Sequence, residues 1–239
     1  MSKGYESSDG SDEHLEEEEE LKRDGLTKTH IAAYSVGHFC NDMTGAMWFF
    51  YFTLYLKTVV ELPDEVIAIA FQFGQLCDGL STPIMGILSD KFTTRWGSRT
   101  PWYVGGTVLV CVGFINLFSE FDFLQDWNED DRNLWYIVNP CIFTTGWSAV
   151  QIAHMSILNN LSQSNFKRDL LVNSKNGFTY AANITVLVMA AILLFLIEND
   201  KVLFRILCFM VIGLGFLTSA FYIFTIDEVR LTREALEYD

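Results

Sequence analysis

Six apolar segments, each close to the length of a membrane-crossing helix, restrict the fold of this chain more than any other feature. They cover residues 31–60, 65–89, 101–120, 134–159, 177–197 and 202–226. A helix of about 20 mostly apolar residues crosses the hydrocarbon core of a bilayer. Inside that core the backbone must pair its own polar groups, which a helix does within each segment. The sequence therefore predicts an all-α protein of the lipid bilayer with six transmembrane helices.

Charge is distributed unevenly between these segments and the rest of the chain. The net charge is -14, and residues 1–27 hold a block of acidic side chains with almost no apolar ones. Such a composition predicts a disordered acidic tail. No basic surface is left to neutralise phosphates, so a nucleic-acid partner is not expected.

Most of the 16 lysines and arginines lie in the tail, in the link between the second and third helices, in residues 160–175 and near the C-terminus. The positive-inside rule therefore predicts that these parts, and both termini, are cytoplasmic. The acidic link at residues 121–133 is expected on the opposite side.

Asp78 is a carboxylate in the middle of the second apolar segment. An ionised Asp at the centre of a membrane helix costs roughly 2.5 to 3.5 kcal/mol on insertion scales, so a retained one usually belongs to an ion or substrate path. Asp78 is thus the first candidate for a functional residue.

Polar side chains recur at helical spacing on the first, second, fourth and fifth predicted helices, which places them on common faces. The candidates are His38, Asp42, Asp78, Thr82, Gln151, His154 and Asn183. Each also has a structural interpretation, because membrane Gln, Asn and Thr often bond neighbouring helices. His38 could likewise serve only to bond Asp42, one turn later.

The link after the second helix has its own pattern of charge and turn residues: Gly86, Asp90, Arg95, Gly97 and Arg99. The order G-x-x-x-D, a basic stretch and then W-G-x-R-x-P-W resembles the signature between helices 2 and 3 of the major facilitator superfamily. The resemblance implies that this link acts as a gating loop, with Asp90 as a latch.

Within that superfamily, the chain most resembles the glycoside-pentoside-hexuronide cation symporter group, which has D-x-x-x-D-P-x-x-G in helix 2. Here Thr82 replaces the second acid, which argues against sodium coupling by two carboxylates. Four blocks, VGHFCNDMTGAMWFFYFTLYL, FGQLCDGLSTPIMG, GWSAVQIAHMSILNNL and FTYAANITV, resemble the branch that imports cysteine into melanosomes and lysosomes.

This resemblance implies that residues 28–226 are one half of a twelve-helix fold, built as a three-plus-three inverted repeat. Residues 227–239 would begin the central cytoplasmic loop, and a second six-helix half would come from the same gene or an oligomer. Lys175 occupies the position of a basic residue at the start of helix 5 in the group.

The expected function is secondary active transport of a small polar solute. The resemblance to the cysteine-importing branch implies that this solute is cysteine and that the membrane is lysosomal or melanosomal. Two alternatives remain: a cation-coupled sugar symporter, and a non-transporting half-carrier with an interaction role. Asp78, Asp42 and His38 are expected to form the coupling locus for a proton or sodium, with Lys175 and Gln151 on the solute. No cofactor is expected, and no motif indicates an enzyme.

Overall fold

The computed structural model describes residues 26–162 and 164–237. Within these ranges the chain forms helices and no strands, and the short antiparallel bridge between Thr94 and Gly97 closes a turn. The predicted acidic tail, residues 1–27, lies almost entirely outside the described residues.

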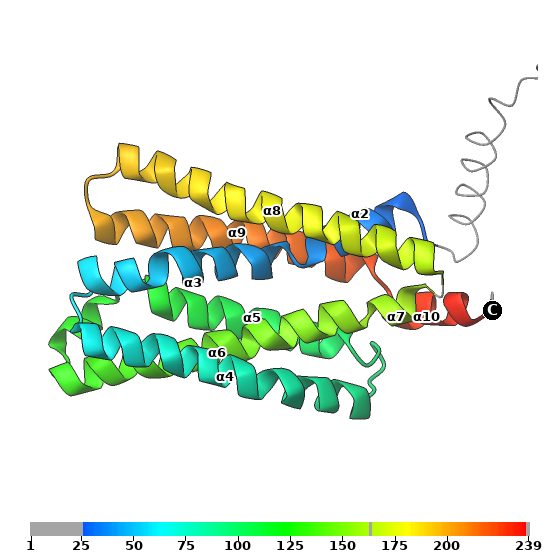
Figure 1. Ribbon diagram of the computed structural model, residues 1–239, viewed down its shortest axis with the longest axis horizontal. Coiled ribbons are helices and arrows are strands. Elements are labelled where there is room, and N and C mark those ends of the chain that lie inside the picture. Colours follow the sequence, from blue (N-terminus) through cyan, green and yellow to red (C-terminus); the bar gives the residue numbers. More distant parts are fainter. Residues whose placement is uncertain (1–25, 163, 238–239) are drawn as a thin grey trace, which may run out of the picture.

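The long helices lie side by side in two layers (Figure 1). One layer contains α2 (Lys28–Gly37), α3 (Phe39–Thr58), α8 (Asn165–Leu196) and α9 (Asp200–Thr225). The other contains α4 (Asp64–Lys91), α5 (Thr100–Phe118) and α6 (Glu129–Ser156). A short 3-10 helix η1 (Asp122–Asp126) and the small helices α7 (Leu158–Leu161) and α10 (Glu228–Glu237) complete the described chain.

Each layer combines helices from both halves of the sequence. The segment α2–α3 packs against α8 and α9, whereas α6 packs against α4 and α5. The first long helix of each half therefore lies with the two later helices of the other half. Contacts of α5 with α3 and α9 join the layers.

Several boundaries differ from the expected ones. The first predicted helix is divided at His38 into α2 and α3. The fourth begins at Glu129, where the Asn128 side chain accepts a hydrogen bond from the Asp131 backbone N–H. The fifth begins at Asn165, and residues expected to open a loop form α10. These added turns are polar, so an apolar-segment search does not detect them.

Three helices are long and apolar enough to cross a membrane by length and composition: Thr100–Phe118, Asn165–Leu196 and Asp200–Thr225. Helices α4 and α6 are 28 residues long each, but their polar side chains lower their mean hydropathy. Six crossings thus remain a prediction.

Glycines allow α5 and α6 to approach closely. A Cβ at Gly106 would lie 2.9 Å from the Gly146 carbonyl oxygen and 2.9 Å from the Val150 nitrogen. A Cβ at Gly113 would lie 2.7 Å from the Phe143 nitrogen. By contrast, a Cβ at Gly105 meets no atom within 4 Å. Small residues commonly permit such contacts between membrane helices.

Gly106→Ala should destabilise the chain by about 1 to 3 kcal/mol, because the added methyl group has no space against the α6 backbone. Gly105→Ala is the matched control, and it should be neutral or slightly stabilising because Ala favours helix over Gly. Thermal unfolding of the purified protein in detergent measures both. Equal melting temperatures for the two variants would contradict the close packing described here.

Candidate functional site

The break between α2 and α3 is held by side chains from other helices. The Tyr103 hydroxyl on α5 donates to the Gly37 carbonyl, and His154 Nε2 on α6 donates to the Tyr34 carbonyl at 2.9 Å. A Cβ at Gly37 would lie 2.5 Å from the Tyr222 ring and 2.9 Å from His154 Nε2. The backbone carbonyls beside the break are therefore bonded by buried side chains, in a place where a larger residue than Gly37 does not fit.

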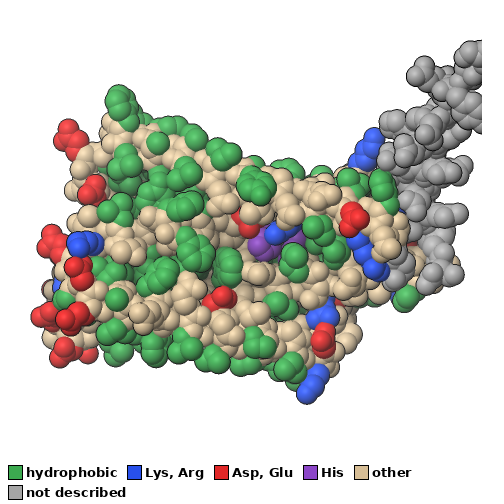
Figure 2. Space-filling model, in the orientation of Figure 1, with side chains coloured by type: hydrophobic (Ala, Val, Ile, Leu, Met, Phe, Trp, Pro, Cys, Tyr) green, Lys and Arg blue, Asp and Glu red, His purple; other side chains and the backbone are tan. Residues whose placement is uncertain are grey.

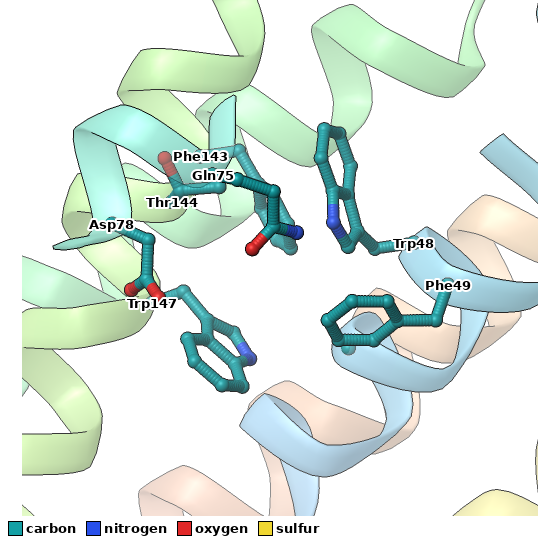
Figure 3. A pocket seen from close by; sticks show the side chains of 8 residues that line it. Trp48, Phe49, Gln75, Asp78, Phe143, Thr144 and Trp147 are labelled. Carbon is teal, nitrogen blue, oxygen red and sulfur yellow. The ribbon is translucent and has the colours of Figure 1, made fainter. Parts of the chain in front are cut away.

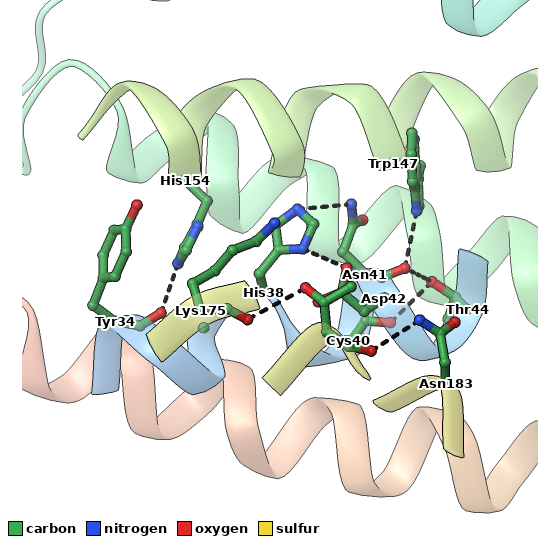
Figure 4. A network of polar contacts seen from close by, with 12 residues as sticks. Tyr34, His38, Cys40, Asn41, Asp42, Thr44, Trp147, His154, Lys175 and Asn183 are labelled. Carbon is green, nitrogen blue, oxygen red and sulfur yellow. Dashed lines mark hydrogen bonds and ion pairs between the residues drawn. The ribbon is translucent and has the colours of Figure 1, made fainter. Parts of the chain in front are cut away.

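His38 lies at the break between α2 and α3, and its buried imidazole pairs with the Asp42 carboxylate. His38 Nδ1 lies 2.9 Å from Asp42 Oδ1, and the two side chains are 4% and 9% exposed. The other carboxylate oxygen, Oδ2, accepts a hydrogen bond of 2.9 Å from the Thr179 hydroxyl on α8. Asn41 Nδ2 donates to His38 Nε2 at 3.4 Å. Figure 4 shows this network joining His38 and α3 to α8.

A second histidine and a lysine complete the cluster. His154 is fully buried, and its ring lies 5.3 Å from that of His38 and stacks on Tyr34 at 4.4 Å, centroid to centroid. The Lys175 side chain extends toward both imidazoles (Figure 4), within electrostatic range of His154. We call His38, Asp42, His154 and Lys175 the helix-break cluster.

The helix-break cluster lies far from the ends of the molecule. Figure 2 shows histidine, basic and acidic side chains close together midway along one face, while most other charges lie near the two ends. Charged groups at this depth are costly in a bilayer and usually face a cavity or a polar path.

Asp78 occupies a separate small pocket between α3, α4 and α6. Gln75, Thr144 and Trp147 line it together with aromatic rings, and the Asp78 and Gln75 side chains point toward it (Figure 3). One carboxylate oxygen, Oδ1, is buried and has no hydrogen-bond partner in the described part of the chain. The pocket volume is about 20 Å³, enough for about one water molecule.

Trp147 lies between the pocket and the helix-break cluster. Its ring lines the Asp78 pocket, and its Nε1 donates to the Asn41 carbonyl at 2.9 Å. Among the described residues no hydrogen bond or ion pair joins Asp78 to His38 or Asp42. The structure therefore brings four of the predicted site residues together and places Asp78 in a neighbouring pocket.

The remaining candidate residues form fewer side-chain hydrogen bonds than the helix-break cluster does. Asn183 Nδ2 donates to the Thr179 carbonyl at 2.9 Å. Gln151 and Thr82 are half-buried, and neither side chain hydrogen-bonds to another described residue. No group of three or more His, Cys, Asp or Glu side chains in the described ranges could hold a metal ion.

Sequence reasoning missed Thr179 and Tyr103, which bond to the cluster and to the break. Thr179 follows Lys175 by four residues and precedes Asn183 by four, so helical spacing alone could have placed it on the same face. Tyr103 carries no such signal, because its partner is a backbone carbonyl 66 positions away.

Side chains within the expected gating loop bond to one another. Arg99 forms an ion pair with Asp90 and also bonds the Ser89 hydroxyl. Gly97 has a φ of 104°, a conformation that favours glycine. Arg95 lies 4.9 Å above the Trp96 ring, and a Cβ at Gly86 would meet no atom within 4 Å.

Glu228 on α10, which the sequence did not indicate, is bound to this loop. Its carboxylate accepts hydrogen bonds from the backbone N–H groups of Ser98, Arg99 and Thr100, the shortest at 2.8 Å. The hydroxyls of Ser98 and Thr100 also donate to it. The side chain is buried at the N-terminus of α5, where an anion is favoured by the helix dipole.

The described residues thus form a helical bundle with an interruption between α2 and α3, buried polar side chains beside it and a small acidic pocket. Discontinuous membrane helices commonly form solute and ion sites in secondary transporters. The chain belongs to the MFS/sugar transport protein family, whose model matches residues 33–237. It is thus a member of the major facilitator superfamily and not an enzyme.

The chain is 32% identical over 211 residues to the mouse (Mus musculus) major facilitator superfamily domain-containing protein 12, covering 80% of this chain and 44% of that protein. It is 28% identical over 184 residues to an uncharacterized symporter of Synechocystis, covering 74% and 32%. The mouse sodium-dependent lysophosphatidylcholine symporter 1 is 24% identical over 152 residues, covering 63% and 28%. The chain thus spans less than half the length of these relatives.

Glu228→Gln should loosen α10 from the gating loop, because the amide can no longer accept at both positions and leaves buried donors unpaired. The expected cost is about 1 to 3 kcal/mol, seen as a lower melting temperature and faster proteolysis within residues 92–99. Glu237→Gln, an exposed position on the same helix, is the control. A Glu228 variant that behaves like the Glu237 variant would show that the carboxylate does not hold the loop.

Proposed function

We propose that this chain forms the solute-binding and cation-coupling half of a secondary active transporter that works by alternating access. The observation that carries the proposal is the helix-break cluster, in which His38 and Asp42 pair at 2.9 Å next to His154 and Lys175. A purely structural bundle gains little from buried charges, since their desolvation costs several kcal/mol per ion in order of magnitude.

The cluster suits a zwitterionic solute. The Asp42 carboxylate can accept from an ammonium group, and Lys175, on α8, can bind a carboxylate. Gln151, on α6, adds neutral hydrogen-bonding capacity. An amino acid carries both charges on one carbon, and cysteine is the member that the resembled branch favours. The membrane would be that of lysosomes or related organelles.

The Asp78 pocket suits the coupling cation and not the solute. A volume of about 20 Å³ holds one water or a bare ion, whereas an amino acid is several times larger. Asp78, Gln75 and Thr144 offer oxygen atoms, which sodium prefers, and a carboxylate can equally take up a proton. Both cations therefore remain candidates, and Trp147 lies where the occupancy of one site can affect the other.

Transport requires a surface that covers the charged side chains that stay partly exposed, Lys175 and Asp78. We infer that a second six-helix half, from the same gene or an oligomer, provides it, because charged groups facing lipid would be unfavourable. The described helices then act as one wall of a central path, with the loop between Asp90 and Arg99 controlling its cytoplasmic end.

Two alternatives make different predictions. A sugar symporter of the same family would use paired acids, and the half-buried Thr82 stands where the second acid would be. A non-transporting half-carrier would keep the His38–Asp42 pair only as a contact between helices. Uptake measurements with amino acids and sugars distinguish all three.

Asp78→Asn in the complete carrier should reduce gradient-driven cysteine uptake roughly tenfold or more, since losing about 1.4 kcal/mol of cation binding already gives a factor of ten. The isosteric amide keeps shape but not charge. Asp64→Asn is the control, because Asp64 is exposed and pairs only with Lys57. Uptake with an unchanged dependence on pH and sodium would reduce Asp78 to a structural role.

The topology can be tested with inserted tags. Tags at the N-terminus and after Glu237 should be accessible from the cytoplasm, and a tag within residues 121–133 should not. The structure supports this arrangement, since α10 contacts both the loop at residues 98–100 and α7. Cytoplasmic labelling of the acidic segment would invert the assignment.

A further inference from the structure

A groove separate from the helix-break cluster and from the Asp78 pocket runs along the outside of α6. It has a volume of about 440 Å³ and is lined by Asn116, Trp127, Asp131, Leu134, Trp135 and Val138, among others. Its α6 residues recur at intervals of three and four, so they form one stripe of the helix. Neither Asp78 nor any member of the helix-break cluster lines it.

The groove carries an acidic side chain at one end and apolar side chains along most of the rest, where Asn116 and Asn139 also line it and bond to each other. Asp131 stands in the first turn of α6, with Trp127 just before the helix. Leu134 and Val138 follow along the stripe and are 56% and 45% exposed. This gradient matches a lipid that lies along a membrane helix, with its headgroup near the polar end and an acyl chain over the apolar residues.

The polar end is suited to a positive charge. The Trp127 and Trp135 rings meet at 86° with centroids 5.8 Å apart, forming a corner, and Phe123 packs against both. The Trp135 Nε1 donates to the Asn116 carbonyl, which fixes that ring. Tryptophan faces attract cations, quaternary ammonium groups in particular, and the Asp131 carboxylate adds a full negative charge.

We propose that this groove binds a membrane lipid with a choline headgroup, the ammonium resting against the tryptophan corner and Asp131. The site lies on the outer side of α5 and α6, at the end of the molecule where η1 lies (Figure 1). It belongs to the bilayer leaflet at that end. Neither the solute nor the coupling cation takes part in it.

The test is native mass spectrometry of the purified chain with added phosphatidylcholine or phosphatidylglycerol of identical acyl chains. The chain should retain phosphatidylcholine preferentially. Asp131→Asn and Trp127→Leu should each weaken that binding about two- to fivefold, as expected for a cation–π or charge contact at an exposed site. Asp130→Asn, which removes a neighbouring acid that does not line the groove, should leave it unchanged.

Free phosphocholine should not displace the lipid, since it lacks the chain that covers Leu134 and Val138. Lipid-free melting temperatures of all variants control for folding. Equal retention of the two lipids overturns the proposal. So does phosphatidylcholine binding that Asp131→Asn or Trp127→Leu leaves as strong as in the unchanged chain, or displacement of the lipid by free phosphocholine.

Discussion

The hydrogen bonds that stabilise the interruption between α2 and α3, at Gly37 and His38, are the constraint on which the rest of the candidate site depends. In a bilayer, backbone groups released from a helix must find partners inside the protein. Tyr103 and His154 provide these partners for the Gly37 and Tyr34 carbonyls. Because both donors come from the opposite layer, the break also fixes the two layers against each other.

The break explains why the charged residues gather where they do. His38 precedes α3, so its imidazole can reach Asp42 within the next turn, and Thr179 attaches that carboxylate to α8. A conformational change that moves α8 relative to α3 must therefore alter the Asp42 environment. Trp147 contributes to both the Asp78 pocket and the contact with Asn41, which gives a physical link between the two sites.

The loop between α4 and α5 is held by a different kind of contact. Glu228 satisfies several N–H groups around the start of α5, while Asp90 and Arg99 pair across the same loop. The two contacts differ in burial, because the Glu228 side chain is buried whereas the Asp90 side chain of the ion pair is 65% exposed. An ion pair that is exposed on one side stabilises little.

The sequence predicted the long helices and the common helix faces of several polar residues, because apolar length and helical spacing leave clear patterns. Asp42, His38 and Lys175 lie together, at the spacing that the first and fifth helices indicate. The break at His38 was not predictable, since residues 31–60 read as one apolar segment and Tyr103, 66 positions away, stabilises the break. Local spacing also could not show that Trp147 separates Asp78 from Asp42, or that Glu228 bonds residues about 130 positions away.

Equilibrium exchange is the measurement that separates a solute-binding helix-break cluster from a purely structural one. Complete carriers in liposomes would be loaded with equal concentrations of cysteine on both sides, and the exchange of labelled cysteine measured without any cation gradient. If the cluster binds the solute, Asp42→Asn should abolish exchange while the melting temperature and the amount of inserted protein stay near those of the wild type. Exchange at the wild-type rate in that variant would show that His38 and Asp42 form only a structural contact.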